Sequence, residues 1–278
     1  MTAIISALLF GLMSSIPISS YMIPVFAVGL MNLDDAGAGA YTTALKIGIL
    51  ASIIVRFRRE LLVMLREIWK LIVLLFTGRI TTAELTGNGR LAVMVLETMI
   101  PIPLYLIVRK GISALGYSGD MTVASICFLA SGVMMIFAIR ADKKHPDKKR
   151  FSRMAPGEAV IDGAGQFMSC LPGFSRTAAA VSIPVLYGYD GEKALEFSYL
   201  MYVPFLAADI IADIISTGMG GYPDGGWMLA ALAAVSAAGA YLSISAARGM
   251  VRRKIMLLPA VFNIVAGAAM MLVELAGV

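Results

Sequence analysis

The sequence predicts an all-α protein that crosses a membrane several times. Of its 278 residues, 59% are hydrophobic and only 15% are charged, whereas an ordinary soluble domain has about 25% charged residues. This is more apolar surface than one soluble core buries, and apolar stretches of membrane-spanning length recur along the chain. Two cysteines and one histidine provide neither a disulfide framework nor the spacing of a metal site. Soluble, disordered and disulfide-rich classes are therefore excluded.

Basic residues predict which side of the membrane each connection occupies. Arg140–Arg153 and Arg248–Lys254 are the densest basic clusters, and the positive-inside rule puts both in the cytoplasm. Counting spans from these clusters puts Arg79 inside, Asp224 outside and both chain termini outside. The net charge of +5 is then explained by orientation and by anionic lipid, and it requires no nucleic acid as a partner.

Apolar stretches predict six membrane spans, because a helix needs about 20 residues to cross a hydrocarbon core of about 30 Å. They are residues 41–55, 91–108, 121–139, 194–215, 228–247 and 255–275. The first is short, and the basic residue Arg56 follows it directly.

Three further segments do not fit as simple spans. Residues 61–76 carry Arg66 and Lys70 in their middle, which is typical of an interfacial amphipathic helix. Residues 1–30 and 156–188 are apolar but are broken by proline and serines, and each must return to the side it came from. We expect two re-entrant hairpins that share an internal cavity, because non-helical backbone at membrane depth needs a polar lining.

The two halves of the chain share one order of elements. Pro17–Ser20 precedes an Ala-Leu pair at the start of a span, as Pro172–Arg176 does in the second half. Each half then consists of a re-entrant hairpin and three spans, so the halves are predicted to be inverted repeats of the kind found in transporters. The predicted organisation is a first repeat at 1–140, a basic cytoplasmic loop at 141–153 and a second repeat at 154–278.

Arg176 is the candidate binding residue. It stands in an apolar stretch with Gly173, Ser175 and Thr177, where a guanidinium is costly unless it is paired or faces a cavity. The planar fork of arginine suits phosphate oxygens, and a helix that begins at a glycine break offers free backbone N–H groups to an anion. This pattern indicates a phosphate site.

Two other sets of residues bear on this site. Hydroxyl groups from Ser19 and Ser20 in the first hairpin are candidates to hydrogen-bond the same anion or to supply a nucleophile. The alternative to a phosphate site is that Arg176 pairs with an internal carboxylate, which would be Glu97, Glu196 or Asp162.

The motif residues resemble a known family. Gly163–Gln166, Leu171–Thr177, and Ala194–Leu200 followed by Pro204 are similar to the undecaprenyl-diphosphate phosphatase family, also called the bacitracin-resistance protein family, whose signature is PGxSRSxxT. The similarity extends to the first hairpin and to the last helix, so it covers nearly the whole chain.

The resemblance implies a polytopic protein of the cell membrane in which two hairpins meet in a cavity open to the outer face. It implies a polyprenyl diphosphate substrate, removal of its terminal phosphate to recycle the carrier lipid, and a divalent metal, Mg²⁺ or Ca²⁺. Gly173, Ser175, Arg176 and Thr177 match the phosphate-holding motif. Ser19 and Ser20 match the serines of the first hairpin, and Gln166 lies within the matched segment.

The sequence also departs from the family. Phe10 and Ser14 replace two glutamates of the first hairpin, and Ile23 replaces its histidine. Within the arginine motif, Thr177 replaces a serine and Ala180 replaces the closing threonine. The replaced acids and histidine are the family's metal ligands and proton carriers, so two functions stay open: a phosphatase with other acids, and a transporter or flippase that does not hydrolyse the lipid.

Four acids are candidates to replace the missing ones: Glu97, Asp162, Asp209 and Asp213. Each also has a structural interpretation. Glu97 would pair with Lys46, Asp162 would stand at a helix start, and the two remaining aspartates would face water near the outer surface.

Overall fold

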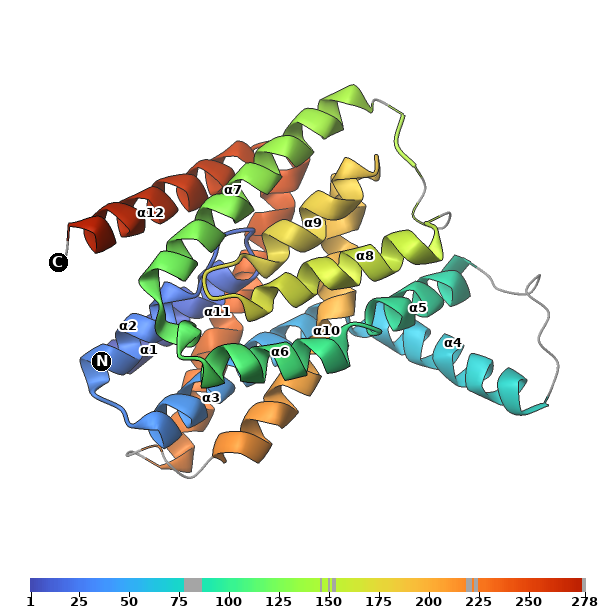
Figure 1. Cartoon of the computed structure of the whole chain (residues 1–278). Coiled ribbons are helices and arrows are strands. Elements are labelled where there is room, and N and C mark those ends of the chain that lie inside the picture. The colour runs from blue at the N-terminus through green and yellow to red at the C-terminus, as the bar shows by residue number, and fades with distance from the viewer. Residues whose placement is uncertain are drawn as a thin grey trace.

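The computed structural model describes residues 1–77, 87–145, 147–149, 151, 154–218, 222 and 225–276, and they fold into helices packed side by side (Figure 1). The helices are α1 Thr2–Ser14, α2 Met22–Met31, α3 Asp35–Arg56, α4 Arg58–Thr77, α5 Gly87–Thr98, α6 Ile102–Ala114, η2 Tyr117–Gly119, α7 Met121–Lys144, α8 Pro156–Phe167, η4 Met168–Cys170, α9 Arg176–Leu186, α10 Gly191–Thr217, α11 Gly226–Arg252 and α12 Leu257–Leu275. The described residues include no β-strand, so the predicted all-α class is confirmed.

Six stretches of the described residues are long and apolar enough to cross a membrane, and each overlaps one predicted span. They are α3, the combined stretch Gly89–Ala114, α7, α10, α11 and α12. The combined stretch turns between α5 and α6, where Pro101 and Pro103 lack the N–H groups that a continuous helix would use. The chain is thus a multi-pass membrane protein.

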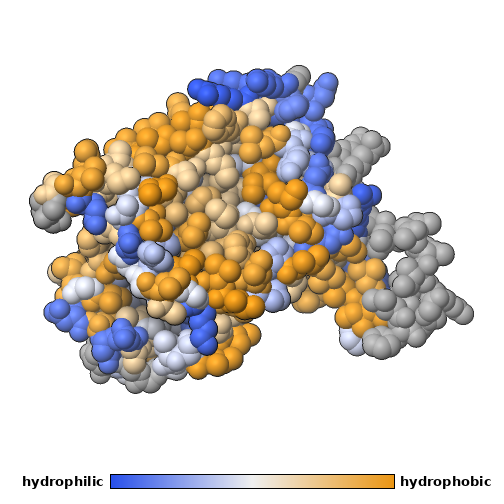
Figure 2. Space-filling view, in the orientation of Figure 1, coloured by the Kyte–Doolittle hydropathy of each residue, from blue (hydrophilic) through white to orange (hydrophobic). Residues whose placement is uncertain are grey.

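The surface of these helices is apolar. Large apolar side chains are exposed on all six of these stretches, among them Ile54, Ile107, Phe137, Ile211, Leu242 and Val265. Hydrophobic residues cover most of the face seen in Figure 2, and hydrophilic residues gather at its opposite ends. Such a surface is stable only when lipid covers it.

Both predicted hairpins consist of two short helices joined by a non-helical break. In the first, α1 and α2 flank residues 15–21; in the second, α8 and η4 precede the break that leads into α9. Helix α1 packs on α11, and α9 packs on α7, α8 and α10. The re-entrant path through a membrane and the division into inverted repeats stay predictions.

Helix α4 coincides with the segment predicted to be amphipathic, and it projects from the other helices at the right of Figure 1. It exposes Leu65 and Trp69, as an interfacial helix would. Arg79, Arg150, Arg153 and Asp224, which the topology prediction used, lie outside the described residues.

Glycines bring the first hairpin close to the rest of the protein. A Cβ atom on Gly11 of α1 would lie 2.2 Å from the carbonyl oxygen of Ser236 on α11, and one on Gly48 of α3 would lie 2.2 Å from that of Ala233. Helix α11 therefore holds both α1 and α3 at backbone contact distance, as small residues do between membrane helices.

Candidate functional site

The end of α1 and the start of α9 meet inside the protein. A guanidinium nitrogen of Arg176, Nη2, donates to the carbonyl oxygen of Ser14 at 3.3 Å and to Oγ1 of Thr177 at 3.0 Å. The hydroxyl of Tyr199 on α10 donates to the carbonyl oxygen of Ser15 at 2.8 Å. The breaks of the two hairpins are thus joined at one place, called the hairpin junction below: residues 14–19 and 173–177.

Two polar atoms in the hairpin junction have no hydrogen-bond partner among the described residues. They are Nη1 of Arg176 and Oγ of Ser15, and both are buried. Arg176 is 9% exposed, and its guanidinium carbon lies 3.1 Å from the centroid of the Tyr202 ring. Buried donors without partners are costly, so these atoms mark a place where a polar ligand would be stabilised.

Local backbone structure fixes how Arg176 is presented. Gly173 has φ +82°, and a Cβ atom there would lie 2.5 Å from the carbonyl oxygen of Ala124, so the turn requires glycine. Ser175 caps α9, because its Oγ accepts from the N–H of Ala178 at 3.3 Å. Its own N–H donates to Oγ of Ser131 on α7 at 2.9 Å. Arg176 therefore stands on the first turn of a helix held from two sides.

Asn263 of α12 holds the break of the first hairpin. Its Oδ1 accepts from the N–H of Ser19 at 3.1 Å, and its Nδ2 donates to the carbonyl oxygen of Pro17 at 3.1 Å. Ser19 is buried and Ser20 half-buried, and neither hydrogen-bonds to Arg176 among the described residues. The sequence analysis did not identify Asn263 or Ser15 as site residues. Asn263 could have been identified, because it is a lone asparagine in an apolar span.

The proposed ion pair between Arg176 and Glu196 is wrong. That carboxylate accepts instead from Lys193 at 2.8 Å and from Arg248 at 3.0 Å. Asp162 does not stand at a helix start either: it is in the middle of α8, wholly buried and without a partner among the described residues. No described carboxylate forms an ion pair with Arg176, which keeps its positive charge available.

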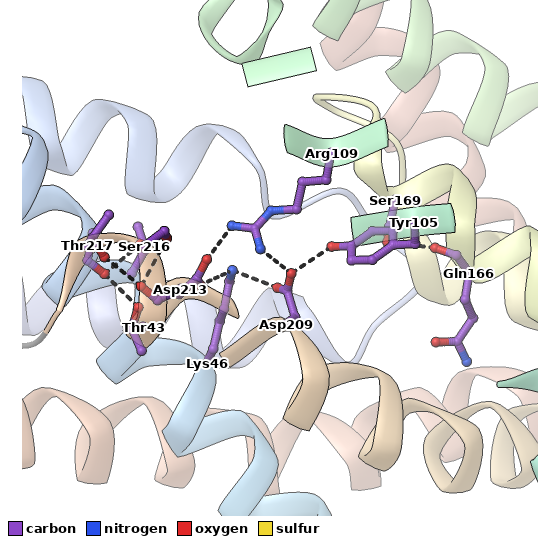
Figure 3. Close-up of polar contacts among 12 residues, drawn as sticks. Thr43, Lys46, Tyr105, Arg109, Gln166, Ser169, Asp209, Asp213, Ser216 and Thr217 are labelled. Carbon is purple, nitrogen blue, oxygen red and sulfur yellow. Dashed lines mark hydrogen bonds and ion pairs between the residues drawn. The ribbon is translucent and has the colours of Figure 1, made fainter. Parts of the chain in front are cut away.

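Asp209 and Asp213 do not face water but form a buried charge cluster (Figure 3). Nζ of Lys46 lies 2.7 Å from Oδ2 of each aspartate, and the two arms of the Arg109 guanidinium bind Oδ1 of each. The hydroxyl of Tyr105 donates to Oδ1 of Asp209 at 3.0 Å. We call these five residues the charge cluster; the predicted pair of Lys46 with Glu97 is wrong, because Lys46 binds the aspartates.

The charge cluster is electrically neutral and lies beside the hairpin junction. The ring centroid of Tyr105 is 4.3 Å from that of Phe205, and both belong to one apolar group with Tyr202, on whose ring Arg176 rests. Since two cations balance two carboxylates, the cluster adds no net charge that would compete for an anion.

The described residues do not provide the divalent metal site that the resemblance implies. They contain no group of three His, Cys, Asp or Glu side chains that could hold a metal ion. At the positions of the missing glutamates, Phe10 packs against the apolar core, and the hydroxyl of Ser14 donates to the carbonyl oxygen of Gly11 at 2.8 Å. The donor set at the hairpin junction consists of hydroxyls, backbone groups and one guanidinium.

Comparisons with known proteins agree with the resemblance. The chain matches the family described as bacitracin resistance protein BacA over residues 3–269. It is 27% identical over 289 residues to an undecaprenyl-diphosphatase of Anaeromyxobacter dehalogenans, with 99% of this chain and 93% of that protein covered. It is 25% identical over 205 residues to an undecaprenyl-diphosphatase of Saccharophagus degradans, with 73% of this chain and 72% of that protein covered.

Proposed function

Because the chain belongs to the bacitracin resistance protein BacA family, we propose that it binds the phosphate end of a polyprenyl diphosphate or polyprenyl phosphate at the hairpin junction. In this proposal the protein acts in the recycling of that carrier lipid in the cell membrane. The relatives' name, undecaprenyl-diphosphatase, indicates the class of lipid.

One observation carries the proposal: Nη1 of Arg176 is buried and has no hydrogen-bond partner in the part of the chain that the structure describes. A phosphate oxygen is the acceptor that best suits a guanidinium, and a hydrogen bond between two charged groups is about twice as strong as a neutral one. The N-terminus of α9 adds a favourable dipole for an anion. Gly173, Ser175, Arg176 and Thr177 are thus the proposed phosphate-binding residues, and the hydroxyl of Ser15 is a further donor.

The lipid chain and the headgroup make different demands on the protein. A polyprenyl chain is satisfied by the apolar outer surface of the helices. The headgroup must reach a guanidinium that is only 9% exposed, so the ring of Tyr202 or the end of α1 must move before a phosphate binds. In this proposal, the structure therefore represents a closed state of the phosphate site.

A second candidate function is transport of the lipid without hydrolysis. Two observations favour it: Phe10 and Ser14 provide no carboxylate, and the charged oxygens of Asp209, Asp213 and Glu196 are already bound to basic side chains. Hydrolysis requires a nucleophile and a proton carrier. Ser19 and Ser20 supply hydroxyls for the first role, but no described carboxylate forms a hydrogen bond with either hydroxyl.

The proposed orientation puts both termini outside and the mouth of the site at the outer face. It is supported by the basic residues that follow α7 and α11. In Figure 1 both chain ends lie on the left, whereas the loop after α7 is at the upper right.

The binding proposal is tested with purified protein in lipid nanodiscs and three labelled ligands: polyprenyl diphosphate, polyprenyl phosphate and polyprenol. We expect both phosphorylated lipids to bind and polyprenol, which lacks the anion, to bind at least tenfold more weakly. Equal affinity for all three would overturn the phosphate site.

Hydrolysis and transport are separated by two assays on the same preparation. Phosphate release from the diphosphate is measured over a range of divalent metals, and movement of labelled polyprenyl phosphate is measured across vesicles that contain the protein. Release would establish the phosphatase. Movement without release would establish the transporter, and the absence of both would contradict each candidate function.

A further inference from the structure

One face of α8 carries polar atoms that nothing in the described structure satisfies. Asp162 is 0% exposed and Gln166 is 1% exposed. Both carboxyl oxygens of Asp162 and Oε1 of Gln166 lack hydrogen-bond partners among the described residues. Since buried polar atoms are almost always paired, three orphaned oxygens on one helix require an explanation.

The two side chains are neighbours on the helix. They are four residues apart, which places them on the same face one turn from each other. Nε2 of Gln166 donates to the carbonyl oxygen of Ser198 on α10 at 3.4 Å. Oε1 is therefore the atom of this amide that is left to accept a hydrogen bond. Figure 3 shows the Gln166 side chain directed away from the charge cluster.

The surroundings of this face are apolar and tightly packed. A Cβ atom on Gly163 would lie 2.5 Å from the carbonyl oxygen of Thr98 on α5, and one on Gly165 would lie 2.2 Å from Cδ1 of Ile183 on α9. Ala159, one turn earlier, belongs to the main apolar core. Helix α8 therefore packs closely against α5 and α9 at this face, and Asp162 is not exposed to solvent in the described structure.

No charged neighbour compensates the carboxyl group. Besides Asp162, the charged and titratable residues of α8 and of α5, η4 and α9, which pack against it, are Glu158, Arg90, Glu97, Cys170 and Arg176. Helix α10, which Gln166 contacts, adds Glu192, Lys193, Glu196, Tyr199, Tyr202, Asp209 and Asp213. None of them forms a hydrogen bond or ion pair with Asp162 in the described structure. Arg90 donates instead to the carbonyl oxygen of Met154, and Arg176 is bound in the hairpin junction.

An ionised carboxylate in such a place is strongly unfavourable, because it has lost its water and gained no partner among the described residues. A carboxylate and an amide oxygen are both acceptors, so they bond to each other only when the carboxyl group carries a hydrogen. A hard metal cation would need about six oxygens or more, whereas three are present.

We propose that Asp162 and Gln166 form an internal proton-binding site in the second hairpin, with the protonated carboxyl of Asp162 donating to Oε1 of Gln166. Among the described residues, no other group forms a hydrogen bond or ion pair with this carboxyl group. Release of the proton would leave a bare charge in the core, so deprotonation requires the hairpin to open. Because α8 and α9 are the two arms of that hairpin, proton binding is coupled to the anion site at Arg176; this coupling rests on the proposed function.

The proton site is tested without any lipid by infrared difference spectroscopy at neutral pH. We expect a protonated-carboxyl C=O band that shifts in D₂O, disappears in Asp162→Asn and moves to higher frequency in Gln166→Leu, which removes the acceptor. The matched control is Asp142→Asn, since Asp142 is paired with Lys148; it should keep the band. A band that is absent from the wild type, or unchanged in Asp162→Asn, would overturn the site.

The coupling is tested by isothermal titration of polyprenyl diphosphate in buffers of different ionisation enthalpy. We expect the wild type and Asp162→Asn to differ by up to one proton exchanged per lipid bound. Equal proton exchange in both would overturn the coupling. A band at Asp162 together with no lipid binding would uphold the proton site and contradict the proposed function, so the two failures are distinguishable.

Discussion

At the scale of single residues, the hairpin junction depends on side chains that satisfy broken backbone. A break at membrane depth leaves N–H and C=O groups without water, and each unsatisfied group is costly there. In the first break, Asn263 accepts a hydrogen bond from the N–H of Ser19 and donates one to the carbonyl oxygen of Pro17. Arg176 donates to the carbonyl oxygen of Ser14, and its Nη1 has no hydrogen-bond partner among the described residues. Asn263 therefore completes the fold, whereas Arg176 keeps a donor for a ligand.

Replacing Asn263 by leucine should destabilise the first hairpin. The substitution strands the N–H of Ser19 and the carbonyl oxygen of Pro17, at a cost of about 1–3 kcal/mol for each buried group. Thermal unfolding in detergent would measure a lower midpoint. Asn32→Gly is the control, because Asn32 is exposed and has φ 49°, which glycine adopts easily. An unchanged midpoint for Asn263→Leu would show that the break does not need this side chain.

Single residues are also where sequence reasoning was most limited. Arg176 was identified because an arginine in an apolar stretch is costly wherever it lies. Its partners were not identified, since the carbonyl oxygen of Ser14 is 162 residues away and no periodicity encodes such a contact. The same holds for the contact of Glu196 with Arg248, which lies 52 residues away along the chain.

At the scale of helices, the charge cluster ties three elements together. Lys46 belongs to α3, Arg109 and Tyr105 to α6, and the two aspartates to α10. Each aspartate contacts both cations, so loss of any one of the four charged members leaves a charge of the cluster uncompensated.

Lys46→Met should therefore destabilise the protein by about 3–5 kcal/mol, the usual cost of breaking a buried ion pair on one side. The double variant Lys46→Met/Asp213→Asn restores neutrality and should recover part of the loss. Denaturant titration of the wild type, both single variants and the double variant gives the coupling energy directly. Additive losses, with no recovery in the double variant, would contradict a shared cluster.

The start of α8 should make stability depend on pH. Burial by itself raises the pKa of Glu158, but hydrogen bonds from Tyr189 and from the N–H of Ala155, together with the charge of Lys149, leave that pKa below its ordinary value. A lowered pKa in the folded state stabilises the protein above the ordinary pKa of about 4.3, and the contribution is lost as pH falls below it.

Tyr189→Phe removes the shortest of these bonds, 2.5 Å from the hydroxyl to Oε2 of Glu158. The variant should be less stable than the wild type at pH 7, and the difference should shrink toward acid pH. Unfolding midpoints measured from pH 7 down to about pH 2.5 check this, because the contribution is lost only below the ordinary pKa of the carboxyl group. A stability difference that grows as the pH falls would reverse the assigned sign.

At the scale of the whole molecule, the sequence predicted the arrangement of helices along the chain better than it predicted contacts between individual side chains. The six spans, the amphipathic helix and both broken segments follow from the spacing of apolar and basic residues, and the helices are found there. Lipid imposes these features on the backbone directly, because an unsatisfied peptide group cannot be exposed to it. Pairing across helices is set by packing, so the charge cluster emerged only from the structure.

The proposed orientation is checked by labelling introduced cysteines in intact cells. Cys127 and Cys170 are buried and should stay unreactive. A membrane-impermeant thiol reagent should label Asp35→Cys, which lies outside in the proposal, but should label Lys144→Cys only after the cells are broken. The opposite pattern would invert the topology.

The central claim, that Arg176 holds the phosphate end of a polyprenyl lipid, is tested most directly by the affinity of Arg176→Ala for polyprenyl diphosphate. Loss of a charged hydrogen bond of about 1.5–3 kcal/mol predicts about 10- to 100-fold weaker binding. Arg252→Ala, in the exposed basic cluster, should bind as the wild type does. Wild-type affinity in folded Arg176→Ala protein would contradict the claim.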